Sequence, residues 1–123
     1  MNNFDKMLSV IEGDMLAEEF ANISDKTSGI KRIILHAFSQ GDKELNHSPR
    51  IKVSNIYGKY RSEDCFVIGV LDLEIKKGTP KITSKELEQV KEWIVVNRKQ
   101  LIKYWKVGVE MPTDTFLASL KSI

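Results

Sequence analysis

The feature that most constrains the fold is a long amphipathic helix near the carboxyl end. Thr83, followed by Glu86, has the spacing of a capping box, which predicts that a helix begins directly after Thr83. From there to about Lys106, the apolar residues fall on one side of a helical wheel: Leu87, Val90, Trp93, Ile94, Leu101, Ile102, Tyr104 and Trp105. Gly108 is suited to end this helix. A helix of this length with one apolar side needs a second layer to cover that side.

Composition favours one soluble domain. The chain has 123 residues, of which 41% are apolar and 29% charged, as in an ordinary globular protein. The longest apolar run, from Phe66 to Leu71, is far too short to cross a bilayer, and the amino end lacks the pattern of a secretory signal. Cys65 is the only cysteine and cannot form an internal disulfide. We therefore expect a cytoplasmic protein that forms a single domain over residues 1–123.

An acidic helical arm is predicted over residues 1–28. Apolar residues recur there at helical spacing, at Phe4, Met7, Leu8, Ile11 and Met15. Gly13 and Asp14 interrupt the pattern, which favours two short helices, about 4–12 and 15–21, followed by a turn at 22–29. Counting this segment gives six carboxylates against two lysines.

Strands are predicted between the arm and the long helix. Residues 30–38 and 50–54 are rich in β-branched side chains, and a third strand is expected over 65–75. The expected fold is therefore α+β: a helical amino-terminal arm, a three- to four-stranded antiparallel sheet, and the long helix packed on one face. Residues 29–107 would form the core, and residues 108–123 a short tail that docks through Phe116, Leu117 and Leu120.

The middle of the chain is basic and offers a candidate binding surface. Residues 29–62 contain seven Lys or Arg against Asp42 and Glu44. Cations interleaved with aromatic rings are typical of surfaces that hold phosphates and stack on bases. The candidate binding residues are Arg50, Lys52, Tyr57, Lys59, Tyr60 and Arg61. Nucleic acid or an acidic partner protein would suit them, and the alternative is a solvated face that only keeps the protein soluble.

Catalytic candidates are sparse. His47, in a loop before Pro49, Asp72 and Arg98 are the residues that we consider. Asp72 could form a carboxylate pair with Glu74, or both could lie at a solvated strand end. Arg98 falls within the apolar side of the helix, where it would either tie the helix to the sheet or hold a ligand.

No familiar catalytic or metal-binding motif occurs in the sequence. There is no glycine-rich phosphate loop, no nucleophile elbow and no zinc-binding helix, and no ligand cluster surrounds His36 or His47. His36 is better explained as a partly buried imidazole on a strand. We expect no metal and no cofactor, and a binding protein more than an enzyme.

Residues 29–107 resemble the small bacterial family known as domain of unknown function forty-one-sixty. The matching segments are IKRIILHAF, HSPRIKV, VLDLEI with the Gly78–Pro80 turn, and ELEQVKEWIVVNRKQLIKYW, in which Trp93, Arg98, Leu101 and Trp105 have the family spacing. Members are often encoded beside a second small protein in toxin–antitoxin-like pairs. The resemblance therefore implies a partner, and a homodimer is a further possibility.

This sequence departs from the family pattern at one place. Arg50 and Lys52 stand where relatives usually carry histidines at alternate positions. Neither cation is a metal ligand at neutral pH, whereas both bind phosphate or carboxylate. The expected function is a partner-binding module of a paired bacterial or phage-borne system. The alternative is a nucleic-acid-binding protein or an RNase-like toxin.

Overall fold

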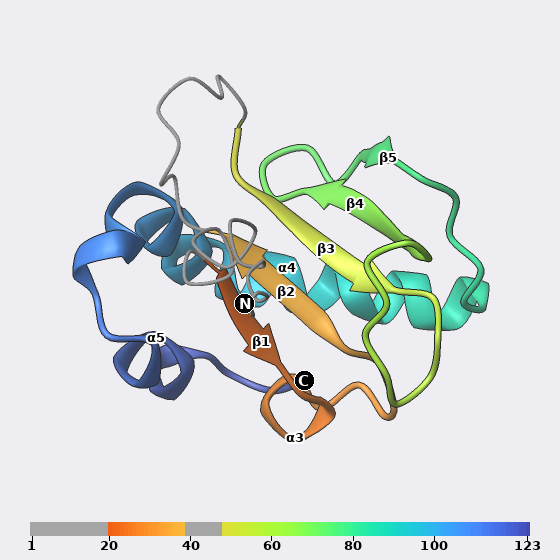
Figure 1. Ribbon diagram of the computed structural model, residues 1–123, viewed down its shortest axis with the longest axis horizontal. Coiled ribbons are helices and arrows are strands. Elements are labelled where there is room, and N and C mark those ends of the chain that lie inside the picture. The colour runs from red at the N-terminus through yellow and green to blue at the C-terminus, as the bar shows by residue number, and fades with distance from the viewer. Residues whose placement is uncertain (1–19, 39–47) are drawn as a thin grey trace, which may run out of the picture.

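A five-stranded antiparallel sheet and one long helix form the two layers of the fold (Figure 1). The computed structural model describes residues 20–38 and 48–123. Within these ranges the strands pair in sequence order, each with the next along the chain: β1 Phe20–Ile23, β2 Leu35–Phe38, β3 Arg50–Ser54, β4 Cys65–Gly69 and β5 Ile75–Lys77. The helices are α3 Asp25–Ser28, α4 Ser84–Val107, the 3-10 turn η1 Gly108–Glu110 and α5 Thr113–Ser119. The chain is thus an α+β protein, as expected.

The long helix begins where its capping box predicts. Thr83 Oγ1 accepts a hydrogen bond from Glu86 N at 3.1 Å, and Glu86 Oε1 accepts one from Thr83 N at 2.9 Å. The apolar side of α4 then packs on the sheet. Together with the inward residues of the strands it forms one core, to which the largest contributions come from Trp93, Tyr104, Phe66, Phe116, Leu35, Ile51, Ile68 and Ile94. Because strand residues alternate in direction, the other face of the sheet is left to a different set of side chains.

The prediction of a helical arm over residues 1–28 is wrong for its described part. Phe20–Ile23 is an edge strand that pairs with β2, with Ala21 opposite Ala37 and Ile23 opposite Leu35. Ala21 and Ile23 are buried while Asn22 between them is exposed, which is the period-two pattern of a strand. A single turn of helix, α3, follows and ends at Gly29 in the left-handed conformation. The helix predicted at 4–12 lies outside the described residues.

The prediction of three or four strands is also wrong, partly because the third predicted strand, over 65–75, is instead the start of a hairpin that spans residues 65–77. After β4 the chain turns at residues 70–74, with Leu73 at φ 60° and its N–H donating to Gly69 O at 3.1 Å. Asp72 Oδ1 accepts a hydrogen bond from Glu74 N at 3.0 Å, a local bond that favours a turn over a continued strand. The apolar run from Phe66 to Leu71 has the pattern of one continuous strand, so the sequence did not predict this turn.

The strand predicted at residues 30–38 is shorter than expected. Only Leu35–Phe38 forms β2, because Arg32 adopts φ 65° and Ile33 N donates to Ile30 O at 3.2 Å. This turn still buries Ile30 and Ile33 in the core. It is held by the side chain of Asp25, whose Oδ2 accepts from Arg32 N at 3.1 Å.

The carboxyl-terminal segment is part of the packed structure. Phe116 of α5 is buried and stacks on Tyr104, with ring centroids 4.0 Å apart. Beyond α5, Asn97 of α4 hydrogen-bonds the backbone of Lys121, and Ile123 N donates to Ser28 O at 2.9 Å. A Cβ at Gly29 would lie 2.5 Å from Ile123 O, so glycine is needed for this close approach. The tail therefore lies between α4 and the segment after β1.

Candidate binding face on the sheet

The face of the sheet opposite α4, here called the outer face, carries the basic residues of the middle of the chain. The strand register places Asn22, His36, Lys52, Val67 and Lys77 in one row across the five strands. Arg50 lies on the same face of β3 as Lys52, because Ile51 between them is buried on the α4 side. The Lys52 ammonium is 5.9 Å from the ring centroid of Phe38. Cations from β3 and β5 thus share one surface.

A ring stack lies on the outer face beside Lys52. Tyr60, from the loop between β3 and β4, stacks on His36 with ring centroids 3.6 Å apart and planes at 14°. His36 is 4% exposed. Burial, and then the charge of Lys52, lower the pKa of His36 to about 4, so the imidazole is neutral at physiological pH. Burial and the neighbouring Cys65 raise the pKa of Tyr60 to about 12, which keeps its hydroxyl protonated.

This histidine gives the fold a pH dependence with a definite sign. The unfolded chain protonates His36 near pH 6.5, whereas the folded chain resists protonation down to about pH 4. The unfolded state therefore binds more protons between these values, and the free energy of unfolding should fall as the pH falls from 6.5 to 4. Urea denaturation at half-unit pH steps measures this slope.

A His36→Gln variant is the matched control for the slope. It should have a flatter profile between pH 6.5 and 5, above the range in which carboxylates titrate. Equal slopes in the two proteins would contradict the assignment to His36.

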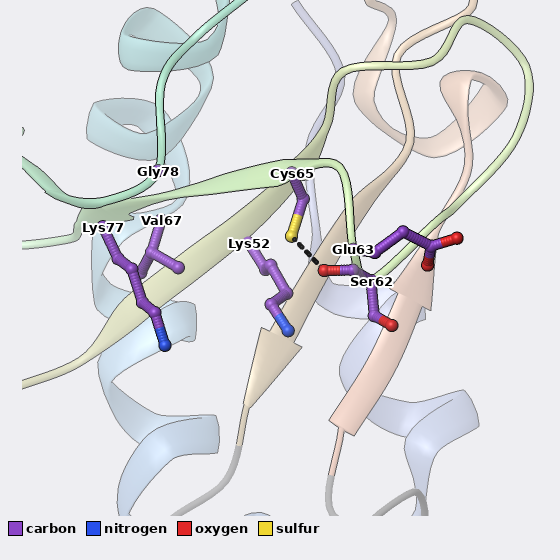
Figure 2. Close-up of a pocket in the computed structure, with 7 residues that line it drawn as sticks. All are labelled: Lys52, Ser62, Glu63, Cys65, Val67, Lys77 and Gly78. Carbon is purple, nitrogen blue, oxygen red and sulfur yellow. Dashed lines mark hydrogen bonds between the residues drawn. The ribbon is translucent and has the colours of Figure 1, made fainter.

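A hollow of about 280 Å³ opens on the outer face between β3, β4 and the segment after β5 (Figure 2). Seven residues line it: Lys52, Ser62, Glu63, Cys65, Val67, Lys77 and Gly78. Val67, which is 8% exposed, stands between the two lysines in the strand register. Cys65 Sγ donates to Ser62 O at 3.2 Å, which fixes the loop against β4. Gly78 has φ 79°, and a Cβ there would lie 2.5 Å from Cys65 O.

The two lysines of the hollow have no acidic partner in the part of the chain that the structure describes. The ion pairs in that part join Arg61 to Glu63, Lys76 to Asp72, Lys81 to Asp64 and Lys91 to Glu88. Glu63, the one carboxylate at the hollow, turns away from Lys52 and Lys77 (Figure 2). The hollow therefore has a positive electrostatic character.

The six predicted binding residues do not form one surface. Arg50, Lys52 and Tyr60 come together on the outer face, whereas Tyr57, in the loop after β3, contacts the first turn of α4. Its hydroxyl donates to Glu86 Oε1 at 2.6 Å, and the guanidinium of Arg32 lies 4.5 Å from its ring centroid. These two contacts of Tyr57 join the loop after β3 to α4 and to the turn before β2.

The remaining predicted binding residues lie on the loop after β3. Lys59 and Arg61 are exposed there, and Arg61 is 3.8 Å from Glu63. The sequence prediction ended the third strand at residue 75 and so did not include Lys77, which lies in β5. Its place in the row depends on the register that the β4–β5 hairpin sets.

The catalytic candidates do not form an active site within the described residues. Asp72 lies in the hairpin turn and pairs with Lys76, which holds the pKa of its carboxyl below the ordinary value. Arg98 Nε donates to Val70 O at 2.9 Å, so this side chain ties α4 to the sheet. His47 lies outside the described residues. Asp72 and Glu74 both belong to the hairpin turn and do not lie on one side of a strand, as both sequence alternatives had assumed.

No group of three or more His, Cys, Asp or Glu side chains gathers in residues 20–38 and 48–123. No helix in these ranges combines the length and apolar character needed to cross a bilayer.

Comparisons with known proteins add no assignment. No protein-family model, no curated protein and no solved structure matches this chain.

Proposed function

We propose that this protein is a small cytoplasmic interaction module, one half of a paired bacterial or phage-borne system, that binds an acidic partner protein through its outer face. The observation that carries the proposal is the gathering of Arg50, Lys52 and Lys77 on the face of the sheet opposite α4. The binding surface then consists of a rigid sheet with cations projecting from it.

The partial burial of two of these cations, Arg50 and Lys52, supports a partner. Lys52 is half-buried without a carboxylate beside it, and the buried Nε of Arg50 has no hydrogen-bond acceptor among the described residues. Buried donors are normally satisfied, and a desolvated cation is normally paired. Carboxylates from a partner would supply these acceptors and would complement the positive surface.

Nucleic acid is the second candidate for the same face. Tyr60 beside Lys52, with Lys59 and Arg61 on the adjoining loop, resembles the mixture of rings and cations that binds single strands. However, one side of the Tyr60 ring is already stacked on His36. This arrangement favours the protein partner. An RNase-like activity has less support, since the described residues bring no acid–base pair together.

Charge reversal on the outer face tests the proposal. We expect the double variant Lys52→Glu and Lys77→Glu to bind a neighbouring-gene protein at least about 100-fold more weakly, because two attractive contacts become repulsive. Isothermal titration calorimetry of the co-expressed pair measures the loss. The matched control reverses Lys85 and Lys99, two exposed lysines of α4, and should keep the wild-type affinity.

Companion measurements separate the alternatives. The double variant Lys52→Gln and Lys77→Gln removes the two charges without reversing them. If its thermal stability is unchanged, weaker binding to the partner cannot be due to loss of folding. Tight binding to a single-stranded oligonucleotide, steeply weakened by salt, would favour the second candidate. A neighbouring protein that binds all variants equally would overturn the proposal. A stable complex between two copies of the chain, lost on charge reversal, would make the partner a homodimer.

A further inference from the structure

We infer that the hollow between Lys52 and Lys77 is a binding site for a phosphate group, either inorganic phosphate or a small phosphomonoester. This inference goes beyond the proposed partner protein, because it assigns a small ligand to a defined part of the outer face. It rests on the placement of the two lysines, on the shape of the hollow and on the donors around it.

The strand register places Lys52 and Lys77 on either side of Val67. Lys52 and Lys77 both lie opposite Val67, one on each neighbouring strand. Their backbones are therefore roughly 10 Å apart, twice the spacing between paired strands. Side chains of this length can converge on one oxyanion held between them. Figure 2 shows both lysines on the same side of the sheet as Val67, with the apolar side chain between them.

Charge favours a dianion at this place. Two cations share the hollow, neither has an ion pair within the described residues, and each repels the other. A bound phosphate would pair with both and remove the repulsion. Glu63 also lines the hollow, but it is 3.8 Å from Arg61, and its carboxylate points away from the two lysines (Figure 2).

The loop before β4 supplies a neutral polar group, the hydroxyl of Ser62, to the hollow. Ser62 presents its hydroxyl on the same side as the lysine ammonium groups (Figure 2). The Ser62 carbonyl already accepts from Cys65 Sγ at 3.2 Å, and this bond holds the serine at the rim. A hydroxyl can donate to a phosphate oxygen, so Ser62 adds a neutral donor at the rim beside Lys52.

The volume of the hollow suits a small ligand. At about 280 Å³ the hollow lies just below the range of about 300–1,000 Å³ that holds drug-sized ligands. Gly78 keeps the wall close to β4, since its backbone approaches Cys65 O. The hollow therefore has room for a phosphate with a small substituent.

Titration of the full-length protein followed by amide NMR tests the inference. With inorganic phosphate at constant ionic strength, we expect saturable shifts centred on Ser62, Cys65, Lys77 and Gly78, with half-saturation near about 1 mM or below. Acetate at the same ionic strength should give no saturable shifts. Parallel titrations with phosphoserine and with a nucleoside 5′-monophosphate identify which source of the phosphate group binds more tightly.

Variants decide whether the hollow is responsible. Lys52→Gln or Lys77→Gln should each weaken phosphate binding about 10- to 100-fold, because each removes a charge-assisted hydrogen bond. Lys85→Gln on α4 should leave it unchanged. Two results would overturn the inference: no saturable shift in about 10 mM phosphate, or folded Lys52→Gln and Lys77→Gln variants that bind phosphate as tightly as the wild-type protein. The partner measurement is separate, so either proposal can fail while the other stands.

Discussion

Replacing Asn97 with alanine is expected to lower the free energy of unfolding by about 2–3 kcal/mol. The side chain of Asn97, a residue that is 1% exposed, makes three hydrogen bonds to the backbone. Its Nδ2 donates to Trp93 O at 3.0 Å and to Lys121 O at 2.9 Å, while its Oδ1 accepts from Lys121 N at 2.7 Å. Alanine would leave the backbone of Lys121 without these partners. The gain in helix propensity, about 0.5 kcal/mol, offsets only a small part of the loss.

A urea denaturation series measures this loss, and Val96→Ala is its control. Val96 lies next to Asn97 on α4 but is 48% exposed, so the same shortening should change stability by less than about 0.5 kcal/mol. A second measurement isolates the tail. In Asn97→Ala, amide exchange at Lys121 and Ile123 should accelerate more than exchange in β3. Unchanged exchange at these two residues would contradict the role of Asn97 in holding the tail.

Helix α4 illustrates what local sequence predicts well. Its start depends on Thr83 and Glu86, which are three residues apart, and its buried side depends on a period that neighbouring residues repeat. The same local logic predicts that Arg50 and Lys52 share one face of β3, because side chains alternate along a strand.

The rest of the fold depends on contacts that local patterns do not contain. Arg32 and Leu73 adopt positive φ, which is uncommon outside glycine, so the turns at these positions interrupt runs that look like strands. The strand β1 forms because β2 offers it an edge to pair with. Local periodicity over residues 1–21 favoured a helix there instead.

The candidate site shows the same division between local and long-range information. Lys77 joins Lys52 only through the pairing of both strands with β4, and Tyr60 reaches His36 only through the path of the loop after β3. Tyr57, three residues before Tyr60, is drawn instead to Glu86. A basic and aromatic segment in sequence is therefore not one surface in space.

Replacing Arg98 with leucine is expected to lower the free energy of unfolding by about 2 kcal/mol while leaving phosphate binding unchanged. Arg98 lies on the side of α4 that packs on the sheet and is half-buried. Its Nε donates to Val70 O at 2.9 Å, which is the carbonyl where β4 gives way to the hairpin turn. Leucine fills the apolar part of the site but leaves this carbonyl without its charged donor.

Two measurements on one variant separate a structural arginine from a ligand anchor. Urea denaturation reports the loss of the bond to Val70, with Lys99→Leu on the exposed side of α4 as the control. Titration with phosphate reports the hollow, which lies on the opposite face of the sheet from α4. A variant that keeps its stability but loses partner or phosphate binding would make Arg98 a binding residue. The reverse result, lower stability with intact binding, follows if α4 supports the sheet and the outer face does the binding.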